Sequence, residues 1–260
     1  MYEAFFGLSR RPFTSIARVD HYFPGEAIEE ARQALARCIE RAEGVGVVVG
    51  PSGTGKTLLC RVLARAFKKS FAVALLSSGR LSTRRALLQA ILFELGQAYR
   101  GMDEGELRLA LVDYLTLSED CPRGMLLLVD EAHTLPLRLL DEIRMITNLV
   151  SGGEPRSRLV VAGGPVLEER FANPKLESLS QRIATRCYLE SFRREETRAY
   201  IHAAIDAAGR EGEEVISSDA CHAVYQAPDG VPRLVNQVCD HALLLACEAG
   251  RELIDRAVIE

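Results

Sequence analysis

The chain has 260 residues, of which 48% are apolar and 26% charged, and its formal net charge is −4. These proportions are typical of a soluble globular protein. The acidic balance gives no overall attraction to nucleic acid or to an anionic membrane surface. No apolar run approaches the roughly 20 residues of a membrane span, so no membrane segment is expected in this chain.

The seven cysteines are odd in number and form no C-x-x-C pair. Several lie in apolar helical contexts, where a thiol behaves as a small buried hydrophobic group. This usage indicates a reducing compartment, and we expect a cytoplasmic domain without a disulfide framework.

The predicted elements fall into three regions, 1–43, 44–191 and 192–260. The first is an aromatic-rich segment and a helix that lead into the core. In the second, helical patterns follow apolar strands, which predicts an α/β fold with a five-stranded parallel sheet. The strands are expected at 44–50, 71–76, 125–129, 158–162 and 187–189, and the helices at 58–67, 82–95, 103–117 and 136–150.

The third region, 192–260, has no further buried-strand pattern. Helical patterns at 195–208, 218–226 and 232–249 predict a small helical domain, with a hinge near Ser191 and Phe192. A last helix capped by Asp255 stops after about one turn. From this abrupt end we expect a longer chain.

The stretch GPSGTGKT at 50–57 fits the phosphate-loop pattern G-x-x-x-x-G-K-S/T, and it lies between a predicted strand and a predicted helix. Glycines let the backbone turn its N–H groups toward a phosphate, and the helix N-terminus adds its positive dipole. Lys56 is expected to meet the β- and γ-phosphates of ATP, and the Thr57 hydroxyl to ligate Mg²⁺. The residues expected to contact the nucleotide are Gly50, Pro51, Ser52, Gly53, Thr54, Gly55, Lys56, Thr57 and Leu58.

Two adjacent carboxylates end the strand at 125–129, in the stretch LLLVDEAH. Asp130 is expected to hold the magnesium ion with its water shell. Glu131 would orient and deprotonate the attacking water, as a carboxylate base can. The alternative is that the acidic pair only caps a helix, but the phosphate loop favours hydrolysis.

The order of these motifs resembles that of AAA+ ATPases. Four segments are similar to the ATPase domain of the general secretion pathway protein A family, which itself resembles ATP-dependent regulators of bacterial transposition. They are MYEAFFGLSRRPF at 1–13, LLLVDEAHTL at 126–135, LSQRI at 179–183 and GVPRLVNQVCDHALLLA at 230–246. The likeness covers essentially the whole chain.

The resemblance implies roles for two arginines. Arg182 is at the arginine-finger position, from which it would reach the γ-phosphate of a neighbouring subunit in a homo-oligomer. Arg186 is a weaker candidate for that role. Arg233 matches the sensor 2 residue of the lid, which touches the phosphates. The alternatives are an ordinary surface arginine for Arg182 and a salt bridge at a helix start for Arg233.

Gly164 departs from the family pattern, because such ATPases usually place a polar sensor 1 residue there. Either Thr147 or Asn148 helps to position the water, or hydrolysis is slower than in relatives. The arginine pairs Arg84-Arg85 and Arg193-Arg194 are interpreted as solvated faces, and a nucleic-acid role is the alternative.

The aromatic residues of the first region have two interpretations. They form a hydrophobic strap over the sheet, or, as the resemblance implies, they lie near the adenine. The residues in question are Tyr2, Phe5, Phe6, Phe13 and Phe23.

The resulting hypothesis is a Mg²⁺-dependent ATPase that acts through oligomer contacts with a protein partner of a secretion or envelope-assembly system. A protein of that family would continue into an inner-membrane anchor. The first alternative is a DNA-associated ATPase that regulates transposition or a similar transaction, and the second is a nucleotide-binding scaffold with little turnover.

Overall fold

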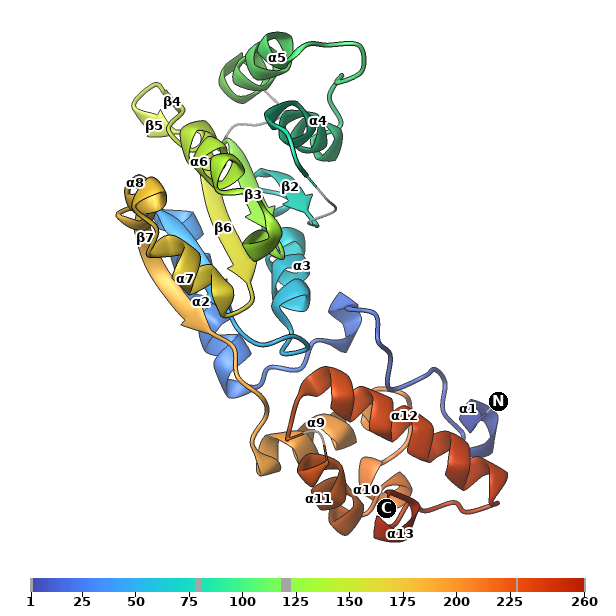
Figure 1. Ribbon diagram of the computed structural model, residues 1–260. Coiled ribbons are helices and arrows are strands. Elements are labelled where there is room, and N and C mark those ends of the chain that lie inside the picture. The colour runs from blue at the N-terminus through green and yellow to red at the C-terminus, as the bar shows by residue number, and fades with distance from the viewer. Residues whose placement is uncertain (1, 78–80, 118–122, 228, 260) are drawn as a thin grey trace. The chain divides into compact units, whose positions relative to one another are not determined.

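The computed structural model describes residues 2–77, 81–117, 123–227 and 229–259 (Figure 1). The chain divides into two compact units. We call Glu29–Pro51 with Lys56–Leu189 the sheet unit, and Met1–Ile28 with Ser52–Gly55 and Glu190–Glu260 the helical unit. Among the described residues, no helix combines the length and the apolar character needed to cross a bilayer.

The sheet unit contains five parallel strands in the order β2-β3-β6-β1-β7. The strands are β1 Val45–Val49, β2 Ala72–Leu76, β3 Met125–Val129, β6 Ser157–Gly163 and β7 Ile183–Tyr188. Every residue of β1, β3 and β6 is buried, which explains why β1 and β3 are continuous apolar runs in the sequence and why β6 is apolar from Leu159 onward. The expected five-stranded parallel sheet is confirmed.

Helices cover both faces of this sheet (Figure 1). Val47, Leu127 and Val161 belong to one core cluster with Leu88 and Leu139 of the covering helices. On the opposite face α2 packs directly on β1, because a Cβ added at Gly46 would lie 2.5 Å from a methyl group of Leu35. The helices, including two short 3-10 turns, are α2 Glu26–Arg41, α3 Lys56–Phe67, α4 Arg84–Glu94, α5 Glu104–Leu117, η2 Ala132–Thr134, α6 Leu137–Ile146, α7 Val166–Phe171, η3 Pro174–Leu176 and α8 Glu177–Ser180.

Two boundaries in the sheet unit differ from the prediction by four residues. Helix α6 ends at Ile146 instead of continuing to 150, and a short hairpin of β4 Val150–Ser151 and β5 Glu154–Pro155 follows it. Gly152 and Gly153 form the hairpin turn with positive φ angles of 63° and 82°. Strand β7 begins four residues before the predicted start, because an edge strand with alternating exposure lacks a continuous apolar signal.

The buried carboxylate of Glu142 connects α4, α5 and α6. The Glu142 side chain is only 1% exposed, and its oxygens lie 3.2 Å from Arg84 Nε and in contact with Arg108 Nη2. Arg84 is therefore half of an ion pair with a buried group and not simply part of a solvated face.

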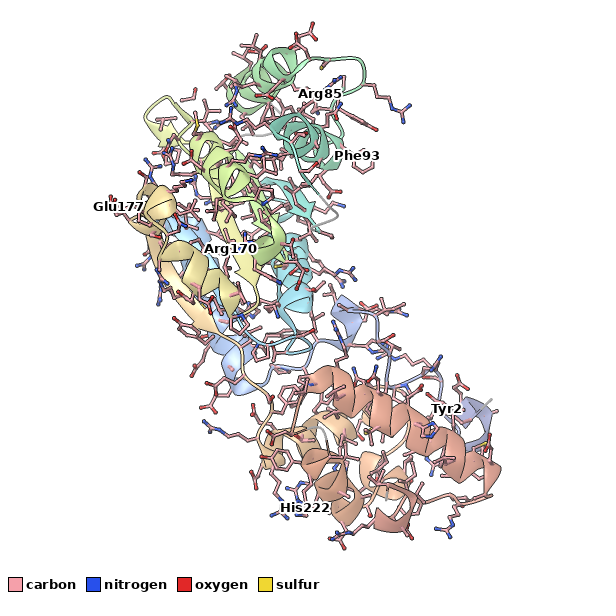
Figure 2. The ribbon with its side chains drawn as sticks, in the orientation of Figure 1. Tyr2, Arg85, Phe93, Arg170, Glu177 and His222 are labelled. Atoms are coloured by element: carbon pink, nitrogen blue, oxygen red, sulfur yellow. The ribbon has the colours of Figure 1, made fainter. Side chains whose placement is uncertain are left out.

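Further along α4, Phe93 projects outward and is 60% exposed (Figure 2).

We expect Glu142→Ala to lower the free energy of unfolding by about 1–3 kcal/mol. The loss should stay below that of a fully buried ion pair, because both arginines are partly exposed and regain water. Urea denaturation would measure it. The matched control is Asp141→Ala on the same helix, which removes a surface ion pair with Arg144 and should cost about 0.5 kcal/mol. Equal losses in the two variants would contradict the prediction.

The helical unit has its own core, which includes the first residues of the chain. Tyr2, Phe6 and Phe13 are buried with Ile201 and Leu243 in one cluster. The helices of this unit, with one 3-10 turn, are α1 Tyr2–Phe5, η1 Val19–His21, α9 Arg194–Asp206, α10 Gly212–Val215, α11 Ser218–Gln226, α12 Pro232–Glu248 and α13 Arg256–Ile259.

The N-terminal aromatic segment is thus not a strap over the sheet. Its buried rings complete the core of the helical unit, while Phe5 is 38% exposed and Phe23 packs edge-on against Phe192 and Tyr200. Residues up to Ile28 belong to that unit, whereas the sequence suggested a separate leading region to residue 43. The proximity of these aromatic residues to adenine stays a prediction.

The six cysteines among the described residues are free thiols, and Cys121 lies outside the described residues. Burial raises the pKa of the Cys187 thiol to about 11 and that of Cys221 to about 12. It also raises the pKa of Cys60 and Cys239. These thiols stay protonated at neutral pH, so they act as apolar packing groups and not as nucleophiles.

Candidate active site

The strand order brings three loops to the carboxyl edge of the sheet. Strand β6 lies between β1 and β3, with Val49 opposite Gly163 and Val129 opposite Val161. The phosphate loop follows β1, the acidic pair follows β3, and the glycine pair Gly163-Gly164 lies at the end of β6. Motifs that are distant in the sequence therefore meet at one edge, which is where open α/β sheets bind their ligands.

The loop after β1 has the backbone that its glycines predict. Gly53 and Gly55 have φ angles of 89° and 103°, a region that residues with a side chain rarely adopt. Lys56 begins α3 and is only 5% exposed, and its Nζ donates hydrogen bonds to the carbonyl oxygens of Gly50 and Pro51, both at 2.7 Å. The first turn of α3 contains no acidic residue, so the helix end and the ammonium group together favour an anion.

The Thr57 hydroxyl and the Asp130 carboxylate lie side by side. Thr57 Oγ1 donates to Asp130 Oδ2 at 2.6 Å, and the Glu131 N–H donates to Asp130 Oδ1 at 2.9 Å. Asp130 is 4% exposed, so both of its oxygens are fixed in a buried position. A hydroxyl and a carboxylate supply the hard oxygen ligands that Mg²⁺ prefers, so this pair fits that ion.

Glu131 has an unusual backbone conformation with φ 50° and ψ 30°, the left-handed region that is uncommon for a residue other than glycine. Conformations of this kind cost free energy and concentrate at functional sites. The Glu131 side chain remains 44% exposed. Its carboxylate is therefore accessible to a water molecule, unlike that of its neighbour Asp130.

The structure places His133 at this edge, where the sequence indicated no role for it. His133 Nδ1 accepts a hydrogen bond from the Gly164 N–H at 3.1 Å, and its Nε2 lies 3.6 Å from Glu131 Oε2. The sequence contained only a weak signal, a histidine two positions after Glu131 in LLLVDEAH and a glycine pair ending another strand.

The two residues suggested to replace a sensor 1 side chain have other partners. Thr147 Oγ1 donates to the Arg144 carbonyl oxygen at 2.7 Å, which caps the end of α6. The Asn148 side-chain oxygen accepts from the Arg182 guanidinium. Neither of these bonds involves Asp130 or Glu131.

The two finger candidates are both exposed and lie in the sheet unit. Arg182 follows α8, and its guanidinium bonds the neutral Asn148 side chain. Arg186 on β7 forms an ion pair with Glu168, and its guanidinium lies 5.9 Å from the Phe171 ring centroid. To bind a phosphate, Arg186 would have to break an ion pair with a carboxylate, whereas Arg182 would break only a hydrogen bond to a neutral amide. The free-energy cost of moving the guanidinium is therefore lower for Arg182.

Arg233 lies in the helical unit together with the tip of the phosphate loop. Its N–H donates to the Gly53 carbonyl and its Nη1 to Ser52 Oγ, both at 3.3 Å. A Cβ added at Gly53 would approach Val231 and the Arg233 side chain to 3.0 Å, so glycine permits this close packing. The sequence-predicted lid arginine therefore lies beside two loop residues expected to contact the nucleotide.

Comparison with known proteins identifies the family. Residues 39–171, about half of the chain, match the family model described as an AAA domain. The chain belongs to the AAA domain family. Over 256 residues this AAA domain is 30% identical to General secretion pathway protein A of Aeromonas hydrophila, a match that covers 98% of the chain and 46% of that relative. The chain thus spans about half the length of the relative.

Solved structures share the fold of this AAA domain. ORC2 of Aeropyrum pernix, solved as ADPNP–ADP complexes, has a TM-score of 0.70 at 18% identity, over 89% of this chain and 65% of that one. Cdc6p of Pyrobaculum aerophilum has a TM-score of 0.69 at 20% identity, over 97% and 68%. The RuvB Holliday junction branch migration motor of Thermotoga maritima has a TM-score of 0.57 at 17% identity, over 89% and 66%. At these identities the likeness shows the α/β P-loop fold.

Proposed function

We propose that this AAA domain binds ATP with Mg²⁺ and hydrolyses it within a homo-oligomer. One observation carries the proposal: the buried Lys56 and Thr57 open α3, and Thr57 Oγ1 lies 2.6 Å from the buried carboxylate of Asp130. A nucleoside triphosphate with its metal requires a cation for the phosphates, and a hydroxyl and a carboxylate for the metal, at a glycine-rich helix start. The fold shared with ORC2, which was solved with ADPNP and ADP, supports the same assignment.

In this proposal the loop residues from Gly50 to Leu58 hold the phosphates through their backbone N–H groups. The ammonium of Lys56 contacts the β- and γ-phosphates, which replace the carbonyl oxygens that it now bonds. Thr57 and Asp130 would hold the metal. Bound Mg²⁺ supplies charge neutralisation to the phosphate oxygens.

Glu131 acts on the attacking water. Its exposed carboxylate accepts the water proton as the water oxygen bonds to the γ-phosphorus, and the bond to the β–γ bridging oxygen breaks to release ADP. Arg182 of a neighbouring subunit stabilises the charge that develops on the phosphoryl group. Arg233 contacts the phosphates from the first turn of α12.

Because the finger is supplied by another subunit, we expect the ATP turnover per subunit to rise with protein concentration. Glu131→Gln and Arg182→Ala should each be inactive alone. A mixture of the two should regain part of the activity, since the first variant donates Arg182 to the intact site of the second. The measurement is phosphate release at fixed ATP and Mg²⁺ over about a hundredfold range of protein concentration.

The matched control is Arg186→Ala. Arg186 lies on β7, four residues after Arg182, and is paired with Glu168. This variant should keep most of the wild-type turnover. A mixture that stays inactive while each variant still binds ATP would contradict a shared site. A flat concentration dependence would contradict it as well.

The relative supports a role in a secretion or envelope-assembly system, in which ATP-driven changes of the oligomer act on a protein partner from the cytoplasmic side. The identity of 30% extends over 98% of the chain, whereas the Holliday junction branch migration motor is only 17% identical. The net charge of −4 also gives no general affinity for DNA. A DNA-associated ATPase therefore remains the second proposal.

A further inference from the structure

The imidazole of His133 lies between two groups of the candidate site. Its Nδ1 is 3.1 Å from the backbone nitrogen of Gly164, and its Nε2 is 3.6 Å from Glu131 Oε2. The His133 side chain is 26% exposed, so most of the ring surface is buried against protein atoms. The residue thus connects the end of β6 to the carboxylate that follows β3.

The bond to Gly164 determines which ring nitrogen carries the proton. A backbone N–H only donates, so Nδ1 has to accept and is unprotonated in this arrangement. The proton of the neutral ring is therefore on Nε2, the nitrogen that faces Glu131. A distance of 3.6 Å exceeds a normal hydrogen bond, so a bond from this nitrogen requires the 44% exposed Glu131 side chain to rotate toward it.

Gly163 provides the space that the imidazole occupies. A Cβ added at Gly163 would lie 3.2 Å from His133 Nδ1 and 3.0 Å from a Leu167 methyl group, which is tighter than ordinary packing. At Gly164 the added atom would lie 3.6 Å from the nearest ring carbon, in van der Waals contact. The end of β6 therefore presents no side chain of its own here, and the ring of His133 lies against it.

We propose that His133 is a positioning residue for Glu131. Its Nε2–H holds one oxygen of the Glu131 carboxylate, so that the other oxygen faces the attacking water. The imidazole thereby supplies the polar group that Gly164 lacks at the end of β6. This inference rests on the proposed ATP hydrolysis.

Three variants separate the contribution of the hydrogen bond at Nδ1, from Gly164, from that of the proposed hydrogen bond at Nε2, to Glu131. His133→Asn keeps an acceptor near the Nδ1 position and so preserves the bond from Gly164, but it loses the donor toward Glu131. His133→Gln places an amide donor near the Nε2 position. His133→Ala removes both. Steady-state ATP turnover gives kcat and KM, and binding of a fluorescent ATP analogue together with thermal unfolding provides readouts that do not depend on catalysis.

The expected order of kcat is wild type and His133→Gln above His133→Asn and His133→Ala. Loss of an orienting partner commonly costs about 10–100-fold, and we expect about tenfold for the last two, with KM and analogue affinity within about twofold of wild type. Nitrogen-15 NMR of the histidine ring should show the Nε2–H tautomer at His133.

A different order of kcat would overturn the proposal. If His133→Asn retains activity and His133→Gln does not, the function of His133 is limited to the hydrogen bond with Gly164 that connects η2 to the end of β6. If all three variants match the wild type, the ring has no part in the reaction. If the wild type binds the analogue but never turns over ATP, the proposed hydrolysis itself fails, and the positioning role fails with it.

Discussion

Replacing Glu131 with Gln is expected to lower the rate of ATP turnover at least about 100-fold, the contribution that a positioned general base commonly makes. The amide has the shape of the carboxylate but cannot take a proton from water. ATP affinity should stay within about threefold, because the groups assigned to the phosphates and the metal, Lys56, Thr57 and Asp130, are unchanged. Turnover at saturating ATP and equilibrium binding of a fluorescent ATP analogue measure the two quantities separately.

The matched control for this variant is Asp141→Asn, which neutralises a partly exposed carboxylate on α6. It should keep the wild-type rate, so that a general effect of removing one negative charge is excluded. A turnover of Glu131→Gln within threefold of the wild type would show that another group takes the proton. It would leave the phosphate-binding assignment untouched.

The second large effect is expected for Lys56→Ala, which should weaken ATP binding by about 10–100-fold. A hydrogen bond to a charged group contributes about 1.5–3 kcal/mol, and the ammonium is the buried cation at the start of α3. The Gly50 and Pro51 carbonyl groups also lose the donor that they now share. Isothermal titration with ATP and Mg²⁺ measures the loss.

Lys68→Ala is the control for the loss of a lysine. Lys68 is exposed just beyond the end of α3, so its removal changes the net charge equally without touching the loop. Its affinity for ATP should equal that of the wild type. Equal affinities for Lys56→Ala and Lys68→Ala would refute the phosphate site at this loop.

The features that the sequence predicted well depend on local patterns. The strands β1 and β3 are buried along their whole length and are followed by glycines or carboxylates, so both their position and their chemistry are visible in a short window. The phosphate loop is recognisable because its glycines and Lys56 have fixed spacing. The parallel sheet then follows from alternation of strands and helices.

The features that the sequence did not predict depend on contacts between distant residues. The place of His133 is set by the left-handed backbone of Glu131 and by a glycine 31 positions further along, and neither effect has a local pattern. The sequence also could not predict which unit the N-terminal aromatic residues pack against, because an aromatic ring can be buried equally well in either hydrophobic core. Only the structure shows that Tyr2, Phe6 and Phe13 belong with Ile201 and Leu243.

That shared core has a consequence for how the chain is made. Tyr2, Phe6 and Phe13 are synthesised before the sheet unit, but their packing partners lie beyond Glu190 and are synthesised after it. At about 5–20 residues per second, these rings wait roughly ten seconds or longer without a core to enter. The sheet unit has all of its strands by residue 188 and can fold during that interval. The newly synthesised chain therefore exposes these aromatic rings, which a chaperone could bind until the residues beyond Glu190 have emerged.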